Sequence, residues 1–176
     1  MSMIREVGDA LTECRIFPYY QPIVALDTRA IVGMEALARI CQPAGGVIAA
    51  GQFQSALTDS NVAIRLTDRM LKLVADDARH WLDRGVPLQQ VGINLSAADF
   101  NADDLEGRIS DAFGAAGVPL RHLLLEVTET VLMDGHDNKA ARSIERLREK
   151  GMLVALDDFG TGYASLTHLL NFPVDI

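Results

Sequence analysis

The sequence predicts an α/β domain built on parallel strands, and two observations lead to that prediction. A layout of helix, glycine and short apolar strand occurs three times, with Gly85, Gly117 and Gly151 spaced 32 and 34 residues apart. Alternating helix and strand units of this length are typical of parallel sheets. The strands are also apolar almost throughout, as in Leu123-Leu124-Leu125, which suits a sheet that is buried on both faces.

The expected elements follow in order along the chain. A helix with an apolar face lies within residues 1–16 and precedes the sheet. Strands over residues 17–26 and 30–38 flank a turn and should pair as a hairpin, and the glycine- and alanine-rich residues 41–51 should form a loop. The three repeats place helices over 62–84, 102–116 and 138–150, and strands over 90–95, 122–127 and 152–157.

Composition bounds the class of protein. A chain of 176 residues with 49% hydrophobic and 23% charged residues fits one globular domain. No run of 18 apolar residues occurs, so a membrane span is not expected, and the first residues do not resemble a secretory signal. The net charge of −8 argues against nucleic acid as a partner. Cys14 and Cys41 form no metal or disulfide pattern, which favours a reducing cytoplasm.

Each repeat strand is apolar until its carboxyl end, where one residue has an oxygen-bearing side chain. These residues are Asn94, Glu126 and Asp157, which are 32 and 31 residues apart, and Glu35 ends an apolar run in the same way. Because sites in α/β folds form at the carboxyl ends of strands, we expect three carboxylates and one amide to lie together. Such oxygen ligands favour Mg²⁺, Mn²⁺ or Ca²⁺, since a cation relieves the repulsion between carboxylates.

Asp158 directly follows Asp157, so one strand end could serve two cations, an arrangement typical of phosphodiester hydrolysis. A structural interpretation stays open for each acidic residue, because carboxylates at strand ends also cap helices or face solvent. The regular spacing favours a shared site. The acidic run from Asp99 to Glu106 is interpreted as a helix start, where negative charges complement the helix dipole. Trp81 is interpreted as a core residue.

Five segments in chain order resemble motifs of the EAL domain family. They are Tyr20-Gln21-Pro22-Ile23, Glu35-Ala36-Leu37, Gly92-Ile93-Asn94-Leu95-Ser96, Leu125-Glu126-Val127-Thr128-Glu129 and Asp157-Asp158-Phe159-Gly160-Thr161-Gly162-Tyr163. The resemblance implies a (β/α)8 barrel, similar to a TIM barrel, whose first strand runs antiparallel. It also implies metal-dependent hydrolysis of the bacterial second messenger cyclic di-GMP to linear pGpG, and a homodimer in the complete domain.

The resemblance further implies a role for individual residues. Glu35, Asn94, Glu126 and Asp157 would bind one Mg²⁺ or Mn²⁺, and Asp157 would bridge to a second ion on Asp158. Glu35, Asp157 and Asp158 are therefore the expected catalytic residues.

Three further residues match the family outside the metal set. Gln21 and Arg39 resemble its ligand contacts, and Glu129 resembles the residue that supports the double-aspartate loop. Arg39 suits the role of a ligand contact because its guanidinium can bind a phosphate with two parallel hydrogen bonds.

The length of the chain sets a further expectation. A βα barrel needs about 250 residues, so residues 1–176 are expected to be a single EAL domain, incomplete at the C-terminus and truncated after about five strands. Residues 1–16 would be the leading helix, and 17–176 barrel strands 1 to 5. A lysine and a later glutamate of the family would be missing, so this chain alone should be inactive, and strand 152–157 should lack its next neighbour.

A non-catalytic module stays open as the alternative function. Such an EAL module would be a receptor for cyclic di-GMP or a protein-interaction domain. The intact set of expected metal ligands favours the enzyme, whereas the absent lysine and glutamate favour the alternative for this chain as it stands.

Overall fold

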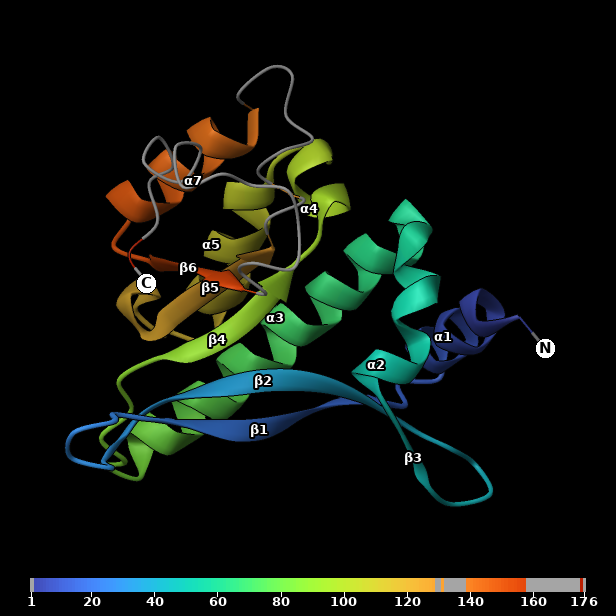
Figure 1. Cartoon of the computed structure of the whole chain (residues 1–176), viewed down its shortest axis with the longest axis horizontal. Coiled ribbons are helices and arrows are strands. Elements are labelled where there is room, and N and C mark those ends of the chain that lie inside the picture. The colour runs from blue at the N-terminus through green and yellow to red at the C-terminus, as the bar shows by residue number, and fades with distance from the viewer. Residues whose placement is uncertain (1, 129–130, 132–138, 158–174, 176) are drawn as a thin grey trace.

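The computed structural model describes residues 2–128, 131, 139–157 and 175. The described chain forms helices and strands in alternation after an N-terminal hairpin (Figure 1). The helices are α1 (Met3–Thr12), α2 (Ala50–Phe53), α3 (Ser60–Asp83), α4 (Ala97–Asn101), α5 (Leu105–Ala115) and α7 (Lys139–Glu149), with 3-10 turns η1 (Gln54–Thr58) and η2 (Leu120–His122). The strands are β1 (Ile16–Val24), β2 (Ile31–Cys41), β3 (Val47–Ala49), β4 (Val91–Leu95), β5 (Leu123–Thr128) and β6 (Leu153–Asp157).

The strands form one sheet in the order β1-β2-β4-β5-β6, with β3 paired to the far half of β2. β1 and β2 are antiparallel, as expected for a hairpin, whereas β2, β4, β5 and β6 are parallel. This confirms the α/β fold class, the parallel repeat and the antiparallel first strand. The sheet is the partial barrel that the sequence predicts, and the carboxyl ends of the parallel strands meet at one edge.

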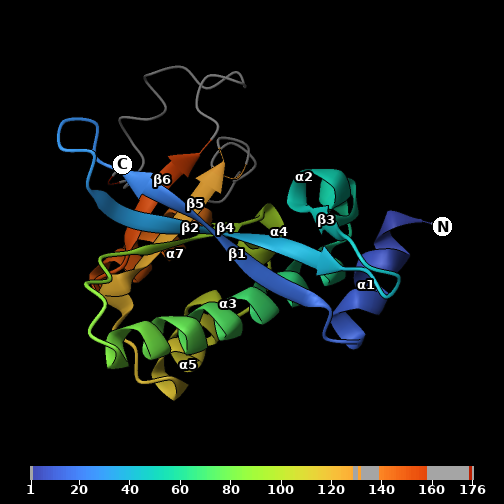
Figure 2. The ribbon, with the colours of Figure 1, turned by 90° about the horizontal axis from the view of Figure 1, so that it is seen from below.

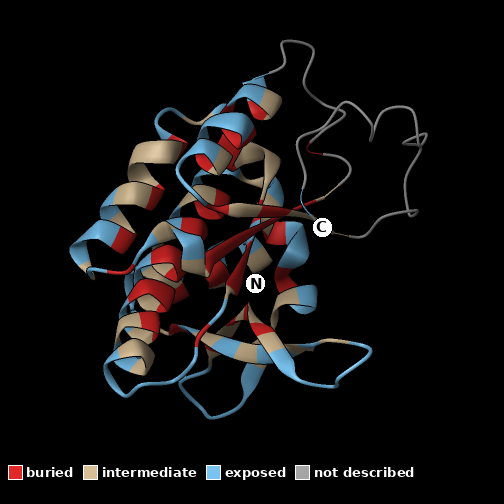
Figure 3. Cartoon of the chain, turned by 90° about the vertical axis from the view of Figure 1, so that its left-hand side faces the viewer, coloured by how far each residue is buried: buried red, intermediate tan, exposed pale blue. Residues whose placement is uncertain are grey.

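Helices α3, α5 and α7 lie along one face of the sheet (Figure 2). Alternation explains this placement, because the strand residues that face the helices are fully or nearly fully buried (Figure 3). Among them are Ala36, Ile40, Val91, Ile93, Leu123, Leu125 and Val154. Each large aliphatic side chain buried in this way contributes about 1.5–3 kcal/mol relative to exposure. The opposite face of the strands is therefore free to bear polar groups.

Helix boundaries follow local signals in the sequence. Asp59 begins α3, because its side chain accepts hydrogen bonds from the backbone N–H groups of Asn61 and Val62. After α3 the chain turns at Gly85, whose φ of 73° is costly for residues with a Cβ atom. Trp81 packs against the core at the end of α3, with its ring edge-on to Tyr20 at 4.7 Å, which agrees with its interpretation as a core residue.

The region that the sequence predicts as a loop differs from expectation. β2 does not end at the expected Ala38 but continues to Cys41, and residues 47–49 return antiparallel to it as β3. The extension is stable because Ala36, Ala38 and Ile40 remain buried on alternate positions. Glu35 therefore lies in the middle of its strand, and the short helix α4 also goes beyond the prediction.

The strand expected to lack a neighbour, β6, has one residue beside it. The backbone N–H of Asp175 donates to the carbonyl of Val154 at 2.8 Å, and the N–H of Val154 donates to Oδ2 of Asp175 at 3.0 Å. Arg148 from α7 binds the same carboxylate through two nitrogens, at 3.0 and 2.5 Å. No helix in the described part of the chain combines the length and apolar character that a membrane crossing requires.

Candidate functional site

The candidate site lies on the face of the sheet that points away from the helices. Gln21 on β1 pairs directly with Glu35 on β2, and Glu35 is in register with Gly92 on β4. Residues two apart on a strand share a face, so Asn94 lies on the same side as Gly92. The hairpin and the first parallel strand thus bring Gln21, Glu35 and Asn94 to one surface.

The same surface continues across the next strands. Asn94 is in register with Glu126 on β5, whereas Asp157 on β6 is in register with Thr128 rather than with Glu126. The sequence spacing predicts equivalent places for all three residues, and this is correct only for Asn94 and Glu126. Asp157 lies two positions farther along, but an even offset keeps it on the same face. Stagger of this kind is usual where strands begin to close into a barrel.

A side-chain hydrogen bond joins two of the expected metal ligands. The amide nitrogen Nδ2 of Asn94 donates to Oε1 of Glu35 at 2.9 Å. The backbone ladder between β2 and β4 ends one residue earlier, at the pair of Ala36 and Ile93. This contact therefore holds the two strands together at the point where their backbones separate.

Among the candidate ligands that the structure describes, Glu126 is the most buried, with only 8% of its surface exposed. Its Oε2 atom is buried without a hydrogen-bond partner. Burial, followed by the negative charges of Glu35 and Asp157, raises the pKa of Glu126 to about 8. A buried carboxyl group with an unpartnered oxygen beside two other carboxylates is costly by itself, and a bound cation would remove that cost.

Gly92 makes room for this carboxyl group. A Cβ atom at position 92 would overlap with Oε1 of Glu126. The absence of a side chain on β4 lets the carboxyl group of the neighbouring strand lie close to the backbone. Gly92 was predicted only as part of a motif, without a role of its own; a glycine inside a strand is the signal that could have identified it.

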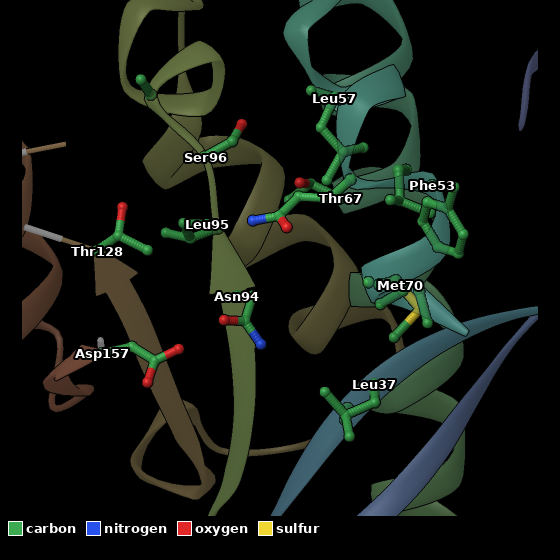
Figure 4. Close-up of a pocket in the computed structure, with 18 of the residues that line it drawn as sticks. Leu37, Phe53, Leu57, Thr67, Met70, Asn94, Leu95, Ser96, Thr128 and Asp157 are labelled. Atoms are coloured by element: carbon green, nitrogen blue, oxygen red, sulfur yellow. The ribbon is translucent and has the colours of Figure 1, made fainter. Parts of the chain in front are cut away.

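A cavity of about 600 Å³ adjoins these residues. Figure 4 shows Asn94, Thr128 and Asp157 on one side of it and Phe53, Leu57 and Met70 on the other. The polar side comes from the ends of β4, β5 and β6, and the apolar side comes from the segments that follow β3. A ligand with both charged and apolar parts fits such a lining.

Arg39 lies farther along β2, on the same face as Glu35. Its Nη1 atom donates to the carbonyl of Ala38 at 2.9 Å, and its guanidinium carbon is 5.7 Å from the centre of the Tyr19 ring. No carboxylate among the described residues forms an ion pair with Arg39 within 4 Å, so its positive charge can serve an anionic ligand. Gln21 is exposed on the neighbouring strand.

The fit of a metal ion can be judged from these donors. Within residues 2–128, 131, 139–157 and 175, no three His, Cys, Asp or Glu side chains stand as a group that could hold a metal ion. The donors nevertheless have the right chemistry, since all are oxygen atoms and one is a buried oxygen without a partner. We conclude that the residues present fit a hard divalent cation. Asp158, the expected ligand of a second ion, and Glu129, the expected loop support, lie outside the described residues.

Two residues near the site escaped sequence reasoning. Thr128 lines the cavity and is in register with Asp157, a role that its distance of two residues from Glu126 could have indicated. Asp99, interpreted as part of an acidic helix start, does lie in the first turn of α4, and it is in addition completely buried. The spacing of Ser96 and Asp99 is a local signal for their mutual contact at the start of α4, whereas the burial of Asp99 depends on Thr67 and Arg108 from other helices.

Comparison with known proteins agrees with this geometry. The chain is 33% identical over 175 residues to the cyclic di-GMP phosphodiesterase NbdA of Pseudomonas aeruginosa. The match covers 99% of this chain and 22% of NbdA. It is 31% identical over 173 residues to the bifunctional diguanylate cyclase and cyclic di-GMP phosphodiesterase MucR of the same organism, spanning 98% of this chain and 25% of MucR. The chain covers only 20–32% of the length of the first curated relatives that it matches.

Solved structures share the fold. The PaMucR phosphodiesterase in complex with c-di-GMP has a TM-score of 0.88 and 31% identity, covering 99% of this chain and 70% of that one. The Klebsiella pneumoniae BlrP1 complex with calcium and cyclic di-GMP has a TM-score of 0.75 and 28% identity, covering 92% and 39%. The protein-family model of the EAL domain matches residues 4–176 of the sequence. With that match over almost its whole length and the expected residues on one face of its sheet, the chain belongs to the EAL domain family.

Proposed function

We propose that this chain takes part in the metal-dependent hydrolysis of cyclic di-GMP to linear pGpG. The observation that carries the proposal is the buried, unpartnered oxygen of Glu126 on the face that also bears Glu35, Asn94 and Asp157. An acidic set of this kind suits a cation that in turn attracts a phosphodiester. The relatedness to NbdA and MucR supports the choice of substrate.

Mg²⁺ or Mn²⁺ would be held by Glu35, Asn94, Glu126 and Asp157, with Asp158 on a second ion. When bound, divalent cations lower the pKa of water and withdraw charge from the phosphate oxygens. Two contacts in the protein position the metal ligands before a cation binds. Asn94 fixes the carboxylate of Glu35 through its amide nitrogen, and Gly92 gives Glu126 its place beside β4.

Other residues would orient the substrate. Arg39 would bind a phosphate of cyclic di-GMP through two nitrogen atoms, and Gln21 would donate from its amide on the adjacent strand. Glu129 would support the loop that contains Asp158. The apolar side of the cavity, formed by residues such as Phe53 and Met70, suits the flat face of a base and limits access of water.

The setting of the reaction belongs to the same proposal. We place the protein in the cytoplasm, which is supported by the two cysteines, Cys14 and Cys41, being unpaired. The homodimer of the complete domain rests on the family resemblance. Cyclic di-GMP is the only nucleotide that we propose as a partner.

The experiment is to incubate the full-length natural protein with cyclic di-GMP and to separate the products by chromatography. We expect pGpG with Mn²⁺ or Mg²⁺ and none with EDTA. Calorimetry with Ca²⁺ should in parallel report binding. Binding without pGpG in any metal would contradict the enzyme and favour the receptor, whereas neither binding nor turnover would contradict both.

A further inference from the structure

A completely buried carboxylate lies just beyond the candidate site. Asp99, on α4, has no exposed surface. Its Oδ2 atom accepts three hydrogen bonds, from the backbone N–H of Ser96 at 2.9 Å, from the hydroxyl of Ser96 at 2.7 Å and from the hydroxyl of Thr67 at 3.0 Å. Ser96 directly follows β4 and caps α4, and Thr67 belongs to α3. One oxygen atom thus ties the end of a strand to a long helix.

The other oxygen of Asp99 faces a cation. Oδ1 accepts a hydrogen bond from Nη2 of Arg108, on α5, at 3.2 Å. The same guanidinium donates to Asp68 at 2.7 Å and to the carbonyl of Ile64 at 3.3 Å, both on α3. A buried charge is tolerated only while its partners stay in place, so this network resists any shift of its members.

The network is joined to the site through β4. Ser96 is two residues after Asn94, and both line the cavity together with Thr67. Beyond Ile93 no backbone ladder ties β4 to β2, so the strand end relies on side chains on that side. The contact of Asn94 with Glu35 supplies one restraint, and Asp99 supplies the other from the helix side.

We propose that Asp99 is a positioning residue for the metal ligand Asn94. Its buried carboxylate fixes the turn from β4 to α4 against α3 and α5, and this keeps the amide of Asn94 on Glu35. The inference rests on the proposed function for the identity of the ligand, but it makes a separate claim about how the ligand is held. Asp99 thus acts on the site indirectly, by orienting Asn94, although its own carboxylate lies outside the cavity.

The test compares divalent metal binding in full-length variants. Asp99→Asn keeps the shape but offers only one acceptor oxygen and leaves Arg108 without its buried counter-charge. We expect the affinity for Mn²⁺, measured by calorimetry without substrate, to fall about tenfold, because partners that orient metal ligands are typically worth that much. Excess Mn²⁺ should restore most of the turnover number. The matched control is Asp104→Ala, which removes the cap of α5 without touching Asp99 and should leave Mn²⁺ affinity unchanged.

A double variant tests whether Asp99 acts through Asn94. In an Asn94→Ala background, Asp99→Asn should cause no further loss of Mn²⁺ affinity, since the ligand through which it acts is gone. An equal loss in both backgrounds, or an unchanged affinity in Asp99→Asn alone, would overturn the proposal.

A milder substitution keeps the proposal testable if Asp99→Asn does not fold. Thr67→Val removes one donor to Asp99 and should weaken Mn²⁺ binding about two- to fivefold, the equivalent of one net hydrogen bond. An unchanged affinity there would also overturn the inference. Weaker Mn²⁺ binding in a protein that makes no pGpG would contradict only the proposed hydrolysis, because the calorimetry needs no substrate.

Discussion

The amide nitrogen of Asn94 is hydrogen-bonded to Oε1 of Glu35 at 2.9 Å, across the gap where β4 and β2 separate. This contact uses the donor end of the amide. The atom that Asn94 can still offer to a cation is therefore its carbonyl oxygen, the kind of ligand that Mg²⁺ and Mn²⁺ accept. One contact thus orders two expected ligands on neighbouring strands.

The first prediction concerns Glu126, whose carboxyl group is buried with one oxygen unpartnered. Burial and the charges of Glu35 and Asp157 force Glu126 to bind a proton on folding near neutral pH, and Glu126→Gln removes that cost. We therefore expect the metal-free protein to gain about 1–3 kcal/mol in free energy of unfolding. The same variant should lose Mn²⁺-dependent hydrolysis of cyclic di-GMP. Urea unfolding in EDTA and a turnover assay check the two parts, and a variant that is both less stable and fully active would contradict the account.

The pH dependence of this effect has a defined sign. The pKa of Glu126 is raised from 4.5 to about 8 in the folded protein. Between those values the folded state binds a proton that the unfolded chain releases, so the stability of the metal-free wild type should fall as the pH rises through this window. The slope should be reduced in Glu126→Gln. Equal slopes for both proteins would show that Glu126 does not titrate in this way.

The second prediction concerns Arg39 and the ring beside it. Arg39→Ala should weaken cyclic di-GMP binding by about 1.5–3 kcal/mol, the usual worth of a hydrogen bond to a charged group. The measurement is calorimetry with Ca²⁺, which should support binding with little hydrolysis. An unchanged affinity would mean that Arg39 does not contact the ligand.

Tyr19 should contribute through Arg39 rather than by itself. Its ring lies 5.7 Å from the guanidinium carbon, and cation–π contacts at exposed sites are worth about 0.5–1 kcal/mol. We expect Tyr19→Leu to weaken binding by that amount in the wild type and by nothing in the Arg39→Ala background. Tyr19→Phe, the control, keeps the ring and should bind normally.

The third prediction concerns the contacts by which Asp175 joins Arg148 on α7 to Val154 on β6. Arg148 holds Asp175 through two nitrogens, and Asp175 is hydrogen-bonded to both backbone groups of Val154. Because the pair is partly exposed, Arg148→Met should cost only about 0.5–1.5 kcal/mol of stability. Arg148 lowers the pKa of Asp175 from its usual 3.8, so the difference between the two proteins should shrink as the pH falls below that value.

Thermal unfolding of the full-length protein measures this effect. Arg79→Met, which breaks an exposed ion pair with Asp83, is the matched control and should unfold close to the wild type. If both variants lost the same stability, the contact of Arg148 with Asp175 would have no special role.

Local patterns account for what the sequence predicts correctly. The apolar spacing and the stop at Gly85 define α3, and the same logic places α5, α7 and the strands after them. These features depend on residues that are close in the chain. The face that bears Glu35, Asn94 and Glu126 follows from strand alternation once the parallel order is known.

Features that depend on distant partners were not predicted. β3 forms because β2 is there to pair with it, although residues 41–51 have the composition of a loop. The register of Asp157 with Thr128 reflects strand stagger, which spacing in the sequence does not contain. Asp99 is buried because Thr67 and Arg108 enclose it, and these residues are 32 and 9 positions away.

The central claim is that the acidic face of the sheet holds the metal on which hydrolysis depends. The most direct measurement is the rate of pGpG formation by the full-length protein and its Glu35→Ala variant over a titration of Mn²⁺. We predict a rate lower by several orders of magnitude in the variant at every Mn²⁺ concentration, and none in EDTA, since metal positioning supplies most of the barrier lowering. Undiminished turnover in Glu35→Ala or in EDTA would contradict the account.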